Sequence, residues 1–166
     1  MTRDRSARAP AWRRLSGATG STLLEAAIIT PLLLLLTFSI MDFSSMFYVY
    51  LALENGVSQA TRYAVTGNLM DDPNNPGGQL SRDDSIKTAM RQATPTLTID
   101  DSAFTFEHMP VGGSAWLGGS GGPGEIQKVT VNYTWTFFDP VLGAFFTGGQ
   151  IALTAESAMK NESRFQ

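Results

Sequence analysis

The fold of this chain is constrained most by a run of residues without charge, which extends from Ala26 to Met41. A helix that crosses a hydrocarbon layer of about 30 Å needs about 20 predominantly apolar residues. After the run, Asp42 is the sole charged residue before Glu54, so the apolar character continues far enough for a span. We therefore expect a membrane-spanning helix. Its centre is a stretch of consecutive leucines: Leu32, Leu33, Leu34, Leu35 and Leu36.

Two other interpretations of the run stay open. A cleaved secretion signal has small residues in an A-x-A-like arrangement after its apolar region, and Ser44-Ser45 is a poor match to that pattern. Arg13-Arg14 would also suit a twin-arginine export signal. The aromatic residues after the run favour a span, because aromatic side chains collect where a helix leaves the bilayer. These residues are Phe43, Phe47, Tyr48 and Tyr50.

Charge is divided unevenly along the chain. Residues 1–20 carry five arginines against one aspartate, whereas the remainder carries fourteen acidic and seven basic side chains. Lys and Arg beside a span hold that side in the cytoplasm, so we expect a cytoplasmic N-terminus and an exported acidic remainder. An acidic body argues against nucleic acid as a partner.

The helical pattern extends past the span. It starts at about Ser21, contains Pro31, which should kink the helix or cost a hydrogen bond, and stops at Gly67. In its second half, apolar residues recur at spacings of three and four, which predicts a face packed on the soluble part. They are Val49, Leu53, Val57, Ala60 and Ala64.

The rest of the chain predicts a second helix followed by strands. Ser81 and Asp84 resemble a capping box, and Pro95 ends the helix. Ile86, Ala89, Met90 and Ala93 are expected to face inward. Strand-like alternation follows at 103–108, 126–138 and 151–159, which predicts a three-stranded antiparallel sheet and an α+β fold. The expected organisation is a basic leader (1–20), a transmembrane and amphipathic helix (21–67) and a soluble α+β domain (68–166).

Residues for catalysis are scarce. The chain has no cysteine and one histidine, His108, so we expect no metal site, no cofactor, no small-molecule substrate and no enzymatic activity. The loop at 71–78 echoes a calcium loop but lacks its closing glutamate, and the glycine-rich loop at 112–124 lacks the lysine of a phosphate loop. Trp116 and Leu117 in that loop could contact a partner or fold back on the sheet.

Two carboxylates border the uncharged run. A charged residue at the mouth of an apolar segment is a functional hypothesis by default, so Glu25 is a candidate site, although its side chain could simply reach water. Asp42 could pair with a cation of a partner helix or mark the membrane interface.

Around Glu25 the residues carry a resemblance. Gly20 followed by Ser21-Thr-Leu-Leu-Glu25 resembles the processing motif of type IV prepilins, in which a glycine precedes the cut and a glutamate stands fifth after it. Residues 25–68, from EAAIITPLLLLL to TRYAVTGN, are similar to the opening domain of the TadE-like family, pilin-like minor proteins of the Tad (Flp) pilus. Ala26 departs from the family, which commonly has an aromatic residue there. The similarity is weaker in the final strands, at IALTAESAMKNE.

The resemblance implies a function and a place in the cell. A prepilin peptidase would cut between Gly20 and Ser21, and the new α-amino group could then neutralise Glu25 within one chain or between neighbours. The protein would be a single-pass protein of the bacterial inner membrane whose partners are other pilin-like subunits and pilus assembly proteins. The alternative is an envelope protein that is never cut and acts as a membrane-anchored binding or scaffold module.

Overall fold

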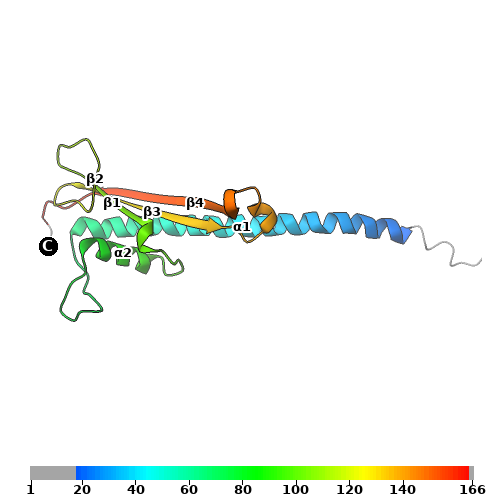
Figure 1. Ribbon diagram of the computed structural model, residues 1–166, viewed down its shortest axis with the longest axis horizontal. Helices are drawn as coiled ribbons and strands as arrows, with labels where there is room; N and C mark the ends of the chain where they lie inside the picture. The colour runs from blue at the N-terminus through cyan, green and yellow to red at the C-terminus, as the bar shows by residue number, and fades with distance from the viewer. Residues whose placement is uncertain (1–17, 165–166) are drawn as a thin grey trace, which may run out of the picture. The chain divides into compact units, whose positions relative to one another are not determined.

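The computed structural model describes residues 18–164, without the side chains of residues 18 and 19; residues 1–17 of the expected leader lie outside it. Its longer elements are the helices α1 (Ala18–Thr66) and α2 (Arg82–Ala93) and the strands β1 (Phe104–Met109), β3 (Ile126–Thr136) and β4 (Gln150–Lys160) (Figure 1). The short ones are η2 (Asp101–Ala103), β2 (Leu117–Gly118), α3 (Pro140–Gly143) and η3 (Thr147–Gly149). The predicted α+β class is therefore confirmed.

Contacts within the chain divide it into two compact units, which meet between Met41 and Asp42. Within the described residues, the first unit consists of the N-terminal half of α1. The second unit contains the other half of α1 together with α2, α3 and every strand.

Helix α1 begins at Ala18, before the expected start at Ser21, and it continues through Pro31. Because proline has no N–H, the helix lacks one backbone hydrogen bond at that turn. The predicted stop is confirmed: Gly67 has a φ of 70° and donates its N–H to the Ala64 carbonyl at 3.1 Å. A positive φ is accessible to glycine at little cost, so this residue can turn the chain out of the helix.

The start of α2 is also close to the prediction. Ser81 is the N-cap, and its Oγ accepts a hydrogen bond from the Asp84 N–H at 3.1 Å. The same hydroxyl donates to the Asp84 carboxylate at 2.7 Å. Ile86 and Met90 are buried as expected, whereas Ala89 is only partly buried and Ala93 is exposed, so the inward face of α2 is narrower than predicted.

The strands form one antiparallel sheet in the order β2-β1-β3-β4. Strands β3 and β4 pair over their whole length, from Ile126↔Lys160 to Thr136↔Gln150. The expectation of three strands was wrong, since β2 arises within the glycine-rich loop and pairs with β1 through His108↔Leu117. A strand of two residues is too short to produce a readable alternation.

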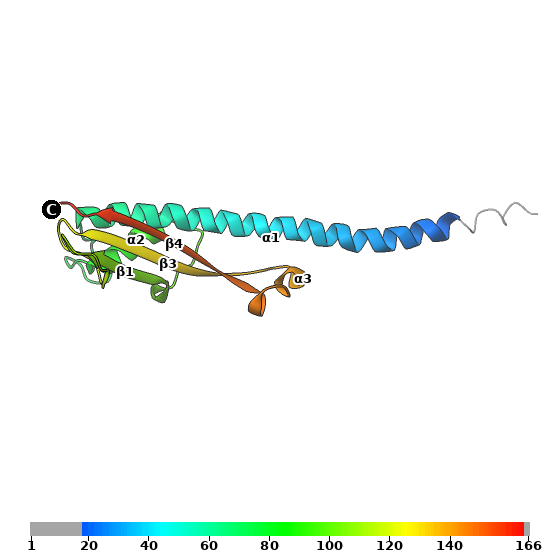
Figure 2. The ribbon, with the colours of Figure 1, turned by 90° about the horizontal axis from the view of Figure 1, so that it is seen from above.

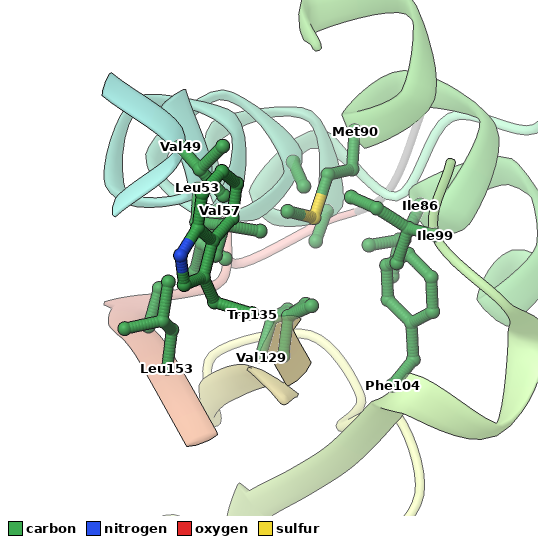
Figure 3. Packing of buried hydrophobic residues seen from close by; sticks show 14 of the residues in the cluster. Val49, Leu53, Val57, Ile86, Met90, Ile99, Phe104, Val129, Trp135 and Leu153 are labelled. Atoms are coloured by element: carbon green, nitrogen blue, oxygen red, sulfur yellow. The ribbon is translucent and has the colours of Figure 1, made fainter. Parts of the chain in front are cut away.

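A single core joins one face of the sheet to the second half of α1 and to α2 (Figures 2 and 3). The predicted helix face is buried, and so are the alternate residues of the strands. Gly56 lets α2 come close, because a Cβ at this position would lie 2.5 Å from Thr94 Cγ2 and 3.3 Å from the Met90 methyl group. The core residues are Val49, Leu53, Val57, Ala60, Ala64, Ile86, Met90, Ile99, Phe104, Val129, Val131, Trp135, Phe137, Leu153 and Ala155.

The other face of the sheet is largely polar. Lys128 on β3 pairs with Glu107 on β1, and its ammonium group lies 4.4 Å from the centre of the Trp116 ring. Trp116 therefore folds back on the sheet, which is one of the two outcomes considered for it.

Candidate functional site

The predicted junction residues lie in the first turns of α1. Gly20 is exposed, and a Cβ placed on it would meet no atom of the described residues within 4 Å. Ser21 donates its hydroxyl to the Glu25 carboxylate at 3.1 Å, across one helical turn. The structure thus brings Ser21 and Glu25 together, on an exposed stretch of helix.

The leucine stretch lies on the surface of the chain and does not pack into its core. Leu32, Leu33, Leu34 and Leu36 all keep about half or more of their surface accessible, and Leu35 is half-buried. Among the described residues, α1 is the helix long and apolar enough to cross a membrane, and none of its most apolar window is buried. Thr37, directly after the leucine stretch, donates its hydroxyl to the Leu33 carbonyl at 2.8 Å, so this polar group needs no water.

Asp42 is buried, with 2 % of its surface exposed. Its two carboxylate oxygens accept the backbone N–H groups of Phe138 at 3.1 Å and Asp139 at 2.9 Å. The structure therefore shows a role for Asp42 that was not considered from the sequence: it ties α1 to the connection between β3 and β4. Hydrogen bonds to a charged acceptor are stronger than those between neutral groups, so this is a firm attachment.

The β3–β4 connection, residues 137–149, is an ordered loop. Asp139 caps α3 by accepting the N–H groups of Val141 at 2.8 Å and Leu142 at 3.4 Å. The Phe137 ring stacks on Phe146 at 4.4 Å and meets the ring of Phe43 on α1 edge-on at 6.0 Å. Two faces of the loop result, one turned to α1 and the other exposed.

The other end of α1 is fastened by a second set of contacts. Arg82 donates to the Ala64 carbonyl at 3.0 Å and also to the Gly121 carbonyl. The N–H of Glu162 donates to the Val65 carbonyl at 3.0 Å. Partial burial of the Arg82 guanidinium lowers its pKa, with Asp83 and Glu125 acting in the opposite direction. These donors satisfy carbonyls that a helix C-terminus leaves without intrahelical partners.

A second apolar surface lies on α1 beyond the uncharged run. Phe43, Phe47, Tyr50 and Leu51 are exposed, although they belong to the unit that has a core. Their spacing of three and four places them on one side of the helix, beside the face that packs on the sheet. We call these four residues the α1 stripe.

No group of three or more His, Asp or Glu side chains that could hold a metal ion occurs within residues 18–164. His108, at 3.9 Å from Glu125, contacts the Gly119 carbonyl through Nδ1 at 3.1 Å and so holds the glycine-rich loop. In the loop at 71–78, Asp72 accepts the N–H of Asn74 at 2.8 Å, as expected for a carboxylate that stabilises a turn.

Part of the chain matches a known protein family. The model of the family described as "TadE: TadE-like protein" matches residues 20–62, which is most of α1. The predicted resemblance to the TadE-like family is therefore confirmed for this segment. Neither the curated proteins nor the solved structures contain a match to the chain.

Proposed function

We propose that this chain is a pilin-like minor protein of a Tad-type pilus, anchored in the bacterial inner membrane and cut by a prepilin peptidase after Gly20. It would take part in assembly of the pilus through contacts with other pilin-like subunits, without enzymatic activity of its own. The observation that carries the proposal is the coincidence of three features at one place. The family match begins at Gly20, the apolar run begins directly after Glu25, and Ser21 lies one helical turn from that carboxylate.

The junction suits a cut for a physical reason. Glycine lets the backbone lie close to a protease, and within the part of the chain that the structure describes no side chain crowds Gly20. Because Gly20 lies inside α1, the first helical turn has to unwind before cleavage. This costs little at a helix start, where the first N–H groups have no intrahelical acceptor.

Cleavage would convert Ser21 into an ammonium group one turn away from Glu25. The pair could form within one chain or between adjacent subunits. A partly buried ion pair contributes little net stability, since desolvation offsets the Coulomb attraction. We therefore assign to Glu25 a role in setting the register of the helix among its neighbours.

The exposed residues of α1 supply surfaces for such neighbours. The α1 stripe is apolar and exposed, and it extends from the end of the uncharged run towards the C-terminus of α1. Exposed apolar patches of this kind mark contacts with other proteins. The proposed orientation places the N-terminus in the cytoplasm and the unit that begins at Asp42 outside it, following the positive charge of residues 1–20.

Mass spectrometry of the protein extracted from membranes of its host tests the processing step. The proposal expects a mature chain that starts at Ser21 and an uncut chain when the peptidase is deleted. A chain that retains residues 1–20 in the peptidase-positive host would overturn the processing step and favour a permanently anchored scaffold module.

The role of Glu25 requires a separate experiment. Glu25→Ala should still be cut after Gly20, but it should no longer enter the pilus fraction or the assembly complex. Glu54→Ala is a matched control, because it removes a carboxylate from the same helix far from the junction. Normal incorporation of Glu25→Ala would contradict the proposed role.

A further inference from the structure

The connection between β3 and β4 exposes large apolar side chains. Phe138 and Phe145 keep 78 % and 81 % of their surface accessible, and Val141 keeps 51 %. All three lie within residues 137–149, on the loop that carries α3 (Figure 2). A loop that lies in water seldom exposes several large apolar side chains together, so this surface is expected to contact an apolar partner.

The place of the loop along α1 indicates that occupant. Asp42 holds the loop through the N–H groups of Phe138 and Asp139, and Asp42 follows Met41, the last residue of the uncharged run. If the span that contains residues 26–41 ends close to Met41, the next residue lies at the membrane surface. The loop that Asp42 binds is therefore at the level where the span ends.

The loop also pairs most of its backbone donors, either within itself or with Asp42. Each N–H from Phe137 to Phe146 has an acceptor; Pro140 has no N–H. The Asp42 and Asp139 carboxylates accept four of these groups, and carbonyls within 137–149 accept the others. In a medium without water an unpaired N–H is costly, so such pairing is what a lipid-facing segment needs.

Charge is absent from the exposed side of the loop. Asp139 is the sole ionisable residue between 137 and 149, and its side chain is buried against the start of α3. A surface of aromatic and aliphatic groups without charge suits the boundary between headgroups and acyl chains, where aromatic residues are enriched.

We propose that residues 137–149 insert Phe138, Val141 and Phe145 into the outer leaflet of the membrane that α1 spans, as a second membrane contact beside the helix. The insertion depth is that of an interfacial segment, about 5–10 Å below the surface. Because Asp42 is part of the helix and also binds the loop, this contact lies where the chain leaves the span. This proposal requires that α1 spans the membrane, but it does not require that the chain is cut after Gly20.

The test uses the full chain, reconstituted in phosphatidylcholine–phosphatidylglycerol bilayers. Since the protein has no cysteine, Phe145→Cys and Val141→Cys provide unique sites for a nitroxide spin label. Val111→Cys is the matched control, because Val111 is 75 % exposed and lies in the glycine-rich region of the same unit. Collision with oxygen, which concentrates in lipid, is compared with collision with a water-soluble nickel chelate.

The proposal expects labels at 145 and 141 to collide severalfold more with oxygen than with nickel, and the label at 111 to show the reverse. Nickel access at 145 and 141 equal to that at 111 would overturn it. A label at 145 that is shielded from both reagents and broadened by labels on other copies would also overturn it, since a second copy would then cover the loop. Circular dichroism of each variant checks that the fold is retained.

Discussion

The two halves of α1 are both rich in apolar residues, yet they meet different surroundings. Between Ala26 and Met41 the apolar residues follow one another without a polar face, and none is buried by residues 18–164. Between Asp42 and Thr66 they recur with a helical period, and one side is buried against the sheet and α2. The change occurs at Asp42, where the two compact units meet.

This difference shows that spacing, rather than apolar content, reports the surroundings of a helix. A continuous apolar surface suits a uniform apolar solvent, whereas a periodic one suits a boundary between core and water. Substitutions in the second unit test this assignment.

The packed side of α1 should tolerate truncation far less than its exposed side. Leu53 is fully buried, so Leu53→Ala should lower the free energy of unfolding of the second unit by about 2–5 kcal/mol. Leu51→Ala is the control, because Leu51 is 59 % exposed and its truncation should cost less than about 0.5 kcal/mol. Denaturant unfolding of the full chain in micelles, followed by near-ultraviolet circular dichroism, measures both. Equal losses would contradict the assignment of the two sides.

Asp42→Ala should detach the β3–β4 connection from α1. The substitution leaves two backbone donors without acceptors and removes charge-assisted hydrogen bonds, at an expected cost of about 2–3 kcal/mol. Hydrogen exchange should accelerate at the N–H groups of Phe138 and Asp139. Asp100→Ala provides the comparison, since Asp100 is exposed and makes no capping bond with its side chain. Unchanged hydrogen exchange at both amides would show that Asp42 does not hold the loop on α1.

Gly56→Ala should destabilise the contact between α1 and α2, although alanine favours helix. The new methyl group would meet Thr94 and Met90, and overpacking of this kind costs about 1–3 kcal/mol. The gain in helix propensity offsets at most about 1 kcal/mol of that cost. Ser58→Ala, two positions further along the helix, should have little effect. A higher melting temperature for Gly56→Ala would show that the helices are not in close contact.

The smallest expected effect concerns pH. Hydrogen bonds from Ser81 and then Lys87 lower the pKa of Asp84 in the folded chain. Because its pKa is lowered on folding, ionised Asp84 stabilises the fold at pH values above its ordinary pKa of about 3.9. This stabilisation is lost as the pH falls through the lowered pKa of the folded state. Because about half of the side chain is exposed, the contribution is below about 1 kcal/mol. The difference in the free energy of unfolding between the native chain and Asp84→Asn should shrink from pH 6 to pH 3. A constant difference would show that ionised Asp84 does not stabilise the fold.

Much of the fold follows from patterns with a regular period. The buried face of α1, the capped start of α2 and the alternation of Val129 and Val131 could all be predicted, because each repeats over several residues. The β2 strand could not, because Leu117 and Gly118 pair with β1 only after the intervening loop has closed.

The candidate site divides in the same way. Gly20, Ser21 and Glu25 are neighbours in the chain, so their proximity could be inferred from spacing alone. Asp42 and the backbone it binds are separated by 96 positions, and such a pairing has no local signature. The Asp139-Pro140 dipeptide did carry a readable signal, since aspartate at an N-cap followed by proline is typical of a helix start.

The most direct test of the account measures where α1 leaves the membrane. Single cysteines at Leu34 and Phe38 and at Asn55 and Gln59 are treated in native membranes with a maleimide that cannot cross lipid; all four positions are exposed in the structure. The account predicts that Asn55→Cys and Gln59→Cys react, whereas Leu34→Cys and Phe38→Cys react only after the membrane is dissolved and the chain unfolded. Reaction of Leu34→Cys at the rate of Gln59→Cys would show that the leucine stretch lies in water, and the membrane-spanning account would fail.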